Sequence, residues 1–207
     1  MFYLFPRAVR PDVCEQIVKE CKQKTFEEAG VYSYPNDTPY IAKTKRPEEV
    51  WVDDPKIRKT KVTYITDRKN KINELVLSYL REANRIQFNY DLTFFQAIQF
   101  AEYKNGGFYG WHQDQGNIDN SNEVRKLSLT LALSNPDTFE GGELQFYNGG
   151  RPMEDMGEIT AEQVTNDIKA QGSVVVFDSR DWHRVWPPVT KGIRHSIVCW
   201  CVGKNFK

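Results

Sequence analysis

Two side chains able to bind a metal ion stand two residues apart in Trp111-His112-Gln113-Asp114-Gln115. Alternate side chains of an extended strand project from the same face, so His112 and Asp114 would point the same way. An imidazole nitrogen beside a carboxylate oxygen provides two ligands for a first-row transition metal. The chain has only three histidines, so a third histidine ligand must come from His183 or His195.

His183, in Asp181-Trp182-His183-Arg184-Val185, is the better candidate for the third ligand, because it belongs to a separate late strand that could cross a barrel from His112. Two histidines and one carboxylate with open coordination positions form the arrangement that non-haem iron(II) oxygenases use. We therefore predict a metal site made by His112, Asp114 and His183.

Eleven residues after His183, a second strand offers a receptor for an anion. One of its faces carries Arg194, Ser196, Val198 and Trp200, and the other carries His195, Ile197, Cys199 and Cys201. A guanidinium fork and a hydroxyl group two residues apart can bind a carboxylate. Because His195 points away from that face, we predict that it is a packed or exposed structural histidine.

The strand Leu127–Leu133 alternates between leucines and small residues. Its odd positions are all leucine and should pack outward beneath helices. Its even positions, Ser128, Thr130 and Ala132, are small and should face the interior of a barrel. Small side chains there leave room for a ligand, whereas a filled core would favour bulky residues.

Two helices and a series of strands must position these residues. We predict a strand within 1–10, helices from Pro11 and over about 71–85, and strands near 93–103, 109–114, 126–134, 142–147, 173–178, 182–187 and 193–202. The fold class is mainly β with flanking helices: a double-stranded β-helix, or jelly roll, backed by N-terminal helices. We expect one domain over 1–207, with helical support and a possible substrate loop in 1–90 and the jelly-roll core in 91–203.

Residues 31–62 show little periodicity and are predicted to be irregular, as a loop that contributes to substrate recognition or as a solvated loop. Residues 43–71 hold ten Lys and Arg against five Asp and Glu, an excess that would suit an acidic partner. A short helix or an irregular insertion is expected within 150–170.

Composition bears on the partners and the cellular location of the protein. Lys plus Arg and Asp plus Glu number 28 each, so the overall charge indicates neither a nucleic-acid nor a membrane partner. The four cysteines lack CxxC spacing and are expected to be buried thiols. No long apolar run follows Met1, so we expect a cytoplasmic protein, in which the sequon at Asn36 has no role.

The ordered set His112-x-Asp114, His183 and Arg194-x-Ser196 resembles the iron(II)- and 2-oxoglutarate-dependent dioxygenases, and within them the prolyl 4-hydroxylase-like branch. The resemblance is close over about residues 90–203. It assigns the 2-oxoglutarate carboxylate to Arg194, Ser196, Tyr103 and Thr130, and the substrate to Tyr109, Arg125, Trp182 and Trp200. Lys126 is one residue from the Arg125 position, and Glu140-Gly141-Gly142-Glu143-Leu144 matches a family turn.

The resemblance implies Fe(II), 2-oxoglutarate and dioxygen, with ascorbate as an added reductant, and release of succinate and carbon dioxide. It implies hydroxylation of prolyl residues in a peptide or protein substrate, with no membrane partner. The alternatives are the same chemistry on a nucleic-acid base or a free small molecule, a non-catalytic jelly-roll binding module, and a cupin-type isomerase or thiol dioxygenase. Nucleic acid is not the expected partner.

Two features depart from collagen-type prolyl 4-hydroxylases. The anchor is Arg194 where those enzymes usually have lysine, and its distance from His183 is one residue longer than is common. A turn at Pro187-Pro188 could absorb the extra residue without moving the strand that follows it.

Overall fold

Residues 2–29, 31–33, 50–52, 55–116, 122–147 and 166–205 are described by a computed structural model of the chain, with backbone alone for 31–33 and 50–52. The helical elements are α1 (Pro11–Cys21), α2 (Lys71–Ala83), the π-helical turn η1 (Asn84–Phe88), the 3-10 turn η2 (Pro136–Thr138) and α3 (Asn166–Lys169). The strands before α2 are β1 (Phe2–Phe5), β2 (Glu27–Glu28), β3 (Val31–Ser33), β4 (Val50–Val52), β5 (Arg58–Lys59) and β6 (Lys61–Ile65). Those after it are β7 (Phe94–Phe95), β8 (Ile98–Tyr103), β9 (Gly107–His112), β10 (Glu123–Ala132), β11 (Glu143–Tyr147), β12 (Val174–Asp178), β13 (Trp182–Val189) and β14 (Arg194–Lys204).

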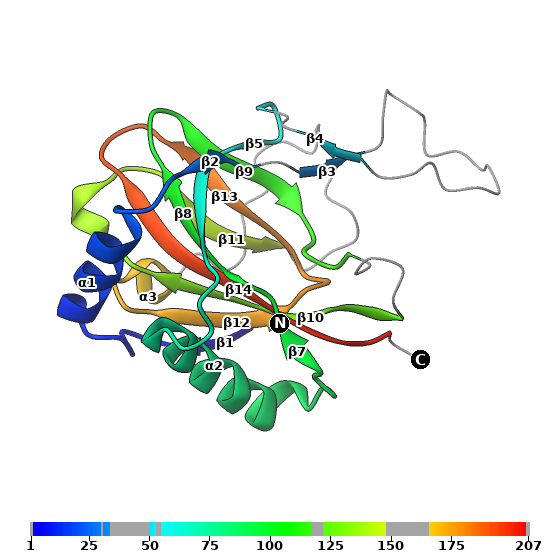
Figure 1. The fold of residues 1–207 in the computed structure, drawn as a ribbon. Coiled ribbons are helices and arrows are strands. Elements are labelled where there is room, and N and C mark those ends of the chain that lie inside the picture. Colours follow the sequence, from blue (N-terminus) through cyan, green and yellow to red (C-terminus); the bar gives the residue numbers. More distant parts are fainter. Residues whose placement is uncertain are drawn as a thin grey trace.

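The strands form two main antiparallel sheets (Figure 1). The larger sheet has the order β1-β12-β10-β14-β8-β6-β2, with β7 paired to β14, and the smaller has the order β11-β13-β9-β5. From β8 to β14 the chain alternates between the larger and the smaller sheet at every step. This alternation is the double-sheet jelly roll that the sequence predicts.

Helices α1 and α2 cover the outer face of the larger sheet (Figure 1). Pro11 occupies the first turn of α1, as predicted, where its missing N–H costs nothing. Helix α2 begins after Asn70, whose side chain accepts a hydrogen bond of 2.8 Å from the Ile72 backbone N–H. Both helices therefore start at positions that the local sequence specifies.

The main apolar core lies between these helices and the larger sheet. It includes the four leucines of the 127–133 strand, which are 0–1% exposed and pack beneath the helices as predicted. The helices contribute Cys14, Ile17, Cys21, Ile72, Val76, Leu80 and Ala83 to the same cluster. All four cysteines are buried and unpaired, which agrees with the prediction of buried thiols.

Two smaller apolar clusters lie between the sheets. One, around Val62, Ala101 and Val185, packs against Tyr109, and the other contains Phe177, whose ring centre is 4.6 Å from that of His183. The small inward side chains of β10 leave the space between these clusters for polar residues.

The prediction that residues 31–62 are irregular is wrong for the part that the structure describes. Strands β3, β4 and β5 and the start of β6 lie in this range, and β5 and β6 extend the two main sheets. Their short length gives no clear two-residue periodicity, and sheet pairing at an edge stabilises them instead. The predicted strand 93–103 is divided into β7 and β8. Residues 34–49, which include the sequon and part of the basic stretch, lie outside the described residues, as do 148–165.

Among the described helices, none has the length and apolar character needed to span a bilayer.

Replacing Leu80 by alanine should lower the free energy of unfolding by about 2–5 kcal/mol, because it opens a cavity between α2 and the larger sheet. Ser78→Ala, at an exposed position of the same helix, should change it by less than about 0.5 kcal/mol. Urea unfolding followed by circular dichroism measures both values. Equal effects of the two substitutions would contradict this account of the core.

Candidate metal and cosubstrate site

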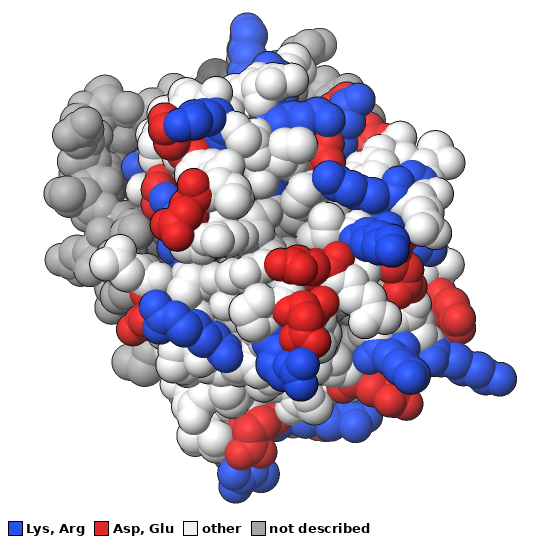
Figure 2. All heavy atoms as spheres, turned by 90° about the vertical axis from the view of Figure 1, so that its left-hand side faces the viewer, with Lys and Arg blue, Asp and Glu red and all other residues white. Residues whose placement is uncertain are grey.

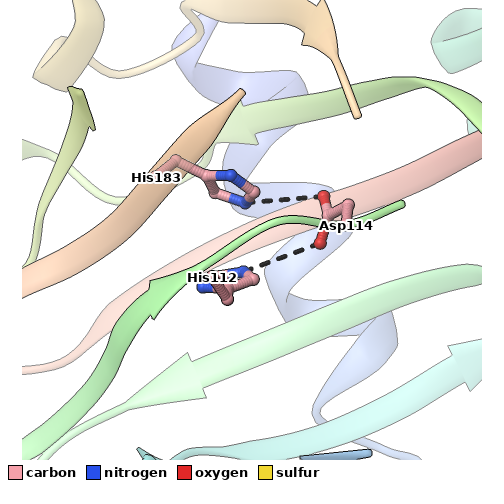
Figure 3. Close-up of side chains that lie close together, drawn as sticks. All are labelled: His112, Asp114 and His183. Carbon is pink, nitrogen blue, oxygen red and sulfur yellow. Dashed lines mark ion pairs between the residues drawn. The ribbon is translucent and has the colours of Figure 1, made fainter. Parts of the chain in front are cut away.

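His112, Asp114 and His183 lie together between the sheets (Figure 3). His112 is the last residue of β9, Asp114 follows that strand, and His183 comes from the paired strand β13. His112 Nε2 is 3.6 Å from Asp114 Oδ1, and His183 Nε2 is 3.5 Å from Asp114 Oδ2. The structure thus brings together the three residues that the sequence nominated.

Backbone carbonyls orient both imidazoles. His112 Nδ1 lies 2.8 Å from the Gly110 carbonyl oxygen, and His183 Nδ1 lies 2.9 Å from that of Asp181. An Nδ1–H that donates to a carbonyl leaves the Nε2 lone pair free for a metal, which is the usual outer support of a histidine ligand. Both Nε2 atoms face the Asp114 carboxylate, so the donor set fits iron(II).

Burial and mutual charge set the protonation of these groups. Burial, and next the neighbouring His183, lower the pKa of His112 to about 4. Burial would raise the pKa of Asp114, but the two imidazoles hold it well below its usual range. Burial would lower the pKa of His183, yet the Asp114 carboxylate raises it above the ordinary 6.5. Without a metal ion, His183 is therefore the group that takes up a proton first.

A β-bulge turns Tyr109 toward the metal-binding residues. His183 pairs with His112 and Val185 with Tyr109, so three steps along β9 match two along β13. Simple alternation would place Tyr109 and His112 on opposite faces. The bulge instead stacks their rings at 3.5 Å and 13°, and it also directs the Gly110 carbonyl at His112. Burial raises the pKa of Tyr109 to about 12, so its phenol is protonated.

Arg194 is buried on the inner face of the larger sheet. Its Nη1 donates to Ser196 Oγ at 3.2 Å, and its Cζ is 5.1 Å from the ring centre of Tyr103, its partner on β8. Burial lowers the pKa of the guanidinium, which still stays charged at neutral pH. Among the described residues Arg194 forms no salt bridge; Glu143, which acts to raise its pKa, pairs with Lys169 at 2.7 Å.

A narrow pocket opens beside the Arg194 side chain. Its lining includes Thr130, Ala132, Gly142, Leu144 and Val175. Thr130 and Ala132 are two of the small residues predicted to leave space. A guanidinium that forms no salt bridge within the described residues, at the wall of such a pocket, provides a receptor for a carboxylate.

The two glycines after Glu140 make room for the strands around the anchor. Gly142 has φ +68°, and a Cβ there would lie 2.8 Å from Arg194 Cδ. Gly141 has φ +83°, and its Cβ would lie 2.3 Å from the Pro188 carbonyl oxygen. The strand register between β13 and β9 shifts between Val185 and Val189, where the two adjacent prolines lie.

A second bulge decides between Arg125 and Lys126. Arg125 pairs with Val202 and Leu127 with Cys201, so two residues of β10 oppose one of β14. Arg125 consequently points inward, with Cζ 4.0 Å from the ring centre of Trp200 and Nη1 3.4 Å from the Asp114 carbonyl oxygen. Lys126 lies on the other side, with Nζ 5.8 Å from the ring centre of Tyr90.

Trp182, which was predicted to bind substrate, and His195, which was predicted to be structural, both lie away from the site. Trp182 alternates with His183 along β13 and so shares the outer face of the smaller sheet with Arg184, which stacks on Trp111 at 4.5 Å. His195 lies beneath the other face of the larger sheet, where its Nε2 is 3.2 Å from Glu102 Oε2. It is a packed histidine, one of the two forms predicted.

Sequence reasoning missed Arg58, which is 7% exposed and stacks on Tyr109 with Cζ 4.5 Å from the ring centre. It belongs to the stretch predicted to be irregular, and a two-residue strand gives no periodic signal. Its pairing with Tyr109 across β5 and β9 is visible only in the structure.

Residues 98–202 match the family model of the 2OG-Fe(II) oxygenase superfamily. The chain belongs to this superfamily. The matched segment contains the three metal-binding candidates, Arg194 and Ser196.

Individual relatives give a finer comparison. A PKHD-type hydroxylase of Synechococcus sp. (strain JA-2-3B'a(2-13)) is 27% identical over 135 residues, which are 64% of this chain and 54% of that protein. The chain thus spans about half the length of this curated relative.

Two solved structures of prolyl hydroxylases share the fold. The viral collagen prolyl hydroxylase of Paramecium Bursaria Chlorella virus-1, solved as a 2OG complex, aligns with a TM-score of 0.66 at 16% identity, over 98% of this chain and 96% of that one. A Trichoplax adhaerens prolyl hydroxylase in complex with a hypoxia inducible factor peptide aligns with a TM-score of 0.63 at 18% identity. The alignment covers 97% of this chain and 82% of that one.

Metal affinity should fall as the pH drops through the raised pKa of His183, because the metal must displace that proton. Above this pKa the imidazole is already neutral and the competition disappears. Calorimetric titration with Mn(II) in two buffers of different ionisation enthalpy should show release of about one proton below the pKa and almost none well above it. Proton release that does not vary with pH would contradict this assignment.

Gly142→Ala should weaken 2-oxoglutarate binding while leaving Mn(II) binding nearly intact, because the added Cβ would meet Val189 and Arg194 and none of the three metal-binding residues. Gly116→Ala is the matched control, since a Cβ there meets nothing within 4 Å. Calorimetry on the Mn(II)-loaded proteins measures both affinities. Unchanged 2-oxoglutarate affinity in Gly142→Ala would mean that this glycine does not position the anchor.

Proposed function

We propose that this protein is an Fe(II)- and 2-oxoglutarate-dependent dioxygenase that hydroxylates prolyl residues in a peptide or protein, releasing succinate and carbon dioxide. The observation that carries the proposal is the combination of a buried His-Asp-His set with a buried Arg194 that forms no salt bridge among the described residues. A cation in the wall of this pocket needs an anion. A 2-oxo acid with a distant carboxylate could reach the metal and Arg194 together.

His112, Asp114 and His183 would hold the iron through two Nε2 atoms and one carboxylate oxygen. When bound, iron(II) supplies the oxidising chemistry of the superfamily, in which dioxygen and 2-oxoglutarate are consumed as a C–H bond is hydroxylated. The protein's residues contribute orientation and a dry environment. The Asp114 and His183 side chains are only 7% and 6% exposed, which keeps bulk water from the reacting groups.

The cosubstrate's distant carboxylate would accept hydrogen bonds from Arg194 and Ser196, with Tyr103 beside them. Thr130 lines the same pocket and offers a further hydroxyl group. Because these groups come from three neighbouring strands of one sheet, their relative positions are held by backbone pairing. Ascorbate would serve as an external reductant, as it does in the branch that the sequence resembles.

The substrate groove of this proposal lies between Tyr109 on the smaller sheet and Arg125 with Trp200 on the larger one. Arg125 stacks on Trp200 and donates to the carbonyl of Asp114, which links the groove to the metal-binding residues. Trp182 lies on the outer face of β13, so we leave it out of the groove. The prolyl hydroxylase complex with a peptide supports a polypeptide substrate.

The alternatives receive less support. A non-catalytic binding module would be expected to lack a metal-binding residue or the anchor, and both are present. A cupin-type enzyme would favour a third histidine ligand, yet His195 is bonded to Glu102 beneath the other face of the larger sheet. On the side shown in Figure 2, which is the left-hand side of Figure 1, basic and acidic side chains are interspersed. The four buried, unpaired thiols support a reducing location such as the cytoplasm.

Arg194→Met should weaken 2-oxoglutarate binding by roughly 2–5 kcal/mol, because it removes a buried charge from a pair with a carboxylate. Metal affinity should stay close to that of the wild type. His195→Gln, on the next residue of β14 but the opposite face, should retain most activity. Succinate formation as a function of 2-oxoglutarate concentration measures the effect, and an unchanged requirement in Arg194→Met would show that the anchor lies elsewhere.

A peptide-library turnover assay with mass-spectrometric detection should show the gain of one oxygen atom on proline-containing peptides. Omission of 2-oxoglutarate is the control and should abolish the gain. Oxygen insertion into a modified base or a free small molecule, with none into peptides, would replace the substrate part of the proposal.

A further inference from the structure

Arg58 lies in β5, the edge strand of the smaller sheet, and is not used by the proposed mechanism. It pairs with Tyr109 on β9, so the two side chains project from the same face, toward the interior. The next residue, Lys59, points the opposite way, and its Nζ donates to the Asn105 carbonyl oxygen at 2.6 Å. The strand therefore separates two adjacent cations into one interior and one surface group.

The Arg58 guanidinium has no anionic partner within the described residues. The side chain is more than nine-tenths buried, and its Nε has no hydrogen-bond partner. Its contact is with the face of the Tyr109 ring, 4.5 Å from Cζ. Such a contact favours a cation but leaves the N–H donors around the edge of the guanidinium plane unused. A buried cation with unused donors is costly unless a ligand pairs with it.

The position of Arg58 relates it to the reacting centre. The Tyr109 ring stacks on Arg58 on one side and on His112, at 3.5 Å, on the other. Guanidinium, phenol and imidazole form one column that ends at a metal-binding residue. These two contacts place Arg58 Cζ no more than about 8 Å from the His112 ring centre, which is roughly the span of two residues of an extended peptide at about 3.3–3.8 Å per residue.

The neighbours of Arg58 point to an anionic ligand. Burial raises the pKa of Tyr64, Arg58 and Arg125 act to lower it, and Glu27 acts to raise it, so two cations and one carboxylate act on this phenol. Arg125 is engaged by Gln96 Oε1 at 2.7 Å, by the Asp114 carbonyl and by the Trp200 ring. Within the described part of the chain, the Arg58 guanidinium contacts the Tyr109 ring, so Arg58 is the cation that we assign to a substrate.

We propose that Arg58 is a receptor for a carboxylate carried by the substrate, within one or two residues of the hydroxylated position. The preferred substrate is then an acidic peptide in which glutamate or aspartate lies beside the target prolyl residue. This inference rests on the proposed function. It concerns the smaller sheet and is separate from Arg194, whose guanidinium faces the 2-oxoglutarate pocket of the larger sheet.

The test compares two peptides that differ only by glutamate or glutamine next to proline. Each is titrated, without oxygen, into protein loaded with Mn(II) and saturating 2-oxoglutarate, so that Arg194 is already occupied. The wild type should bind the glutamate peptide about tenfold more tightly, as expected for a charge-assisted pair. Arg58→Met should abolish this preference and Arg58→Lys should retain part of it. Lys59→Met, the adjacent outward-facing cation, should keep it.

Equal affinities of the wild type for the two peptides, or a preference that survives Arg58→Met, would overturn the inference. If neither peptide binds, the proposal that the substrate is an acidic peptide is also overturned. A parallel titration with N-acetylglutamate and N-acetylglutamine separates the sources: an Arg58-dependent preference for the free acid alone assigns the carboxylate to a small molecule.

Turnover separates this inference from the proposed function. Formation of succinate without peptide is measured in Lys59→Met and in the wild type, and the two rates should be the same because Lys59 points outward from β5. If the glutamate peptide binds with the expected dependence on Arg58 but gains no oxygen, the carboxylate receptor stands and the prolyl assignment fails. If peptides gain oxygen without any dependence on an acidic neighbour, the prolyl assignment stands and the receptor fails.

Discussion

The Asp114 carboxylate is buried between two imidazoles, and the rest of the site depends on that arrangement. A carboxylate removed from water needs nearby cations or donors, and here the Nε2 atoms of His112 and His183 lie 3.6 and 3.5 Å from its oxygens. The imidazoles can face Asp114 only because carbonyls hold their other nitrogens. Those carbonyls belong to a bulge in β9 and to the turn before β13. The bulge and the turn therefore orient the two imidazoles toward Asp114.

The two sheets divide the remaining tasks. The smaller sheet carries the metal-binding histidines, with Tyr109 and Arg58 stacked beside them, while the larger sheet carries Arg194, Ser196 and the small residues of β10. Helices α1 and α2 pack on the outer face of the larger sheet, so they stabilise the scaffold without filling the interior. Because the chain alternates between sheets from β8 to β14, residues far apart in sequence converge on one pocket.

Cations without anionic partners distinguish this interior from an ordinary core. Arg194 and Arg58 are both buried, and among the described residues neither forms a salt bridge. The unfavourable free energy of such groups is consistent with a protein that binds anions on both sheets. Arg125 differs, because Gln96, the Asp114 carbonyl and Trp200 hold it in place. It therefore connects the substrate side to the metal-binding residues.

The sequence alone specified whatever follows from regular alternation and helical periodicity. It identified the two helices, the outward leucines, the inward small residues of β10, and the opposite faces of Arg194 and His195. It also nominated the metal-binding residues, since three histidines leave few combinations. Only the tertiary structure showed where the regular alternation of side chains is interrupted. The interruptions are the bulges that turn Tyr109 and Arg125 inward, and the edge strand that buries Arg58 adds a further inward residue. The physical reason is that bulges and two-residue strands are stabilised by pairing with distant strands, which leaves no local pattern in the sequence.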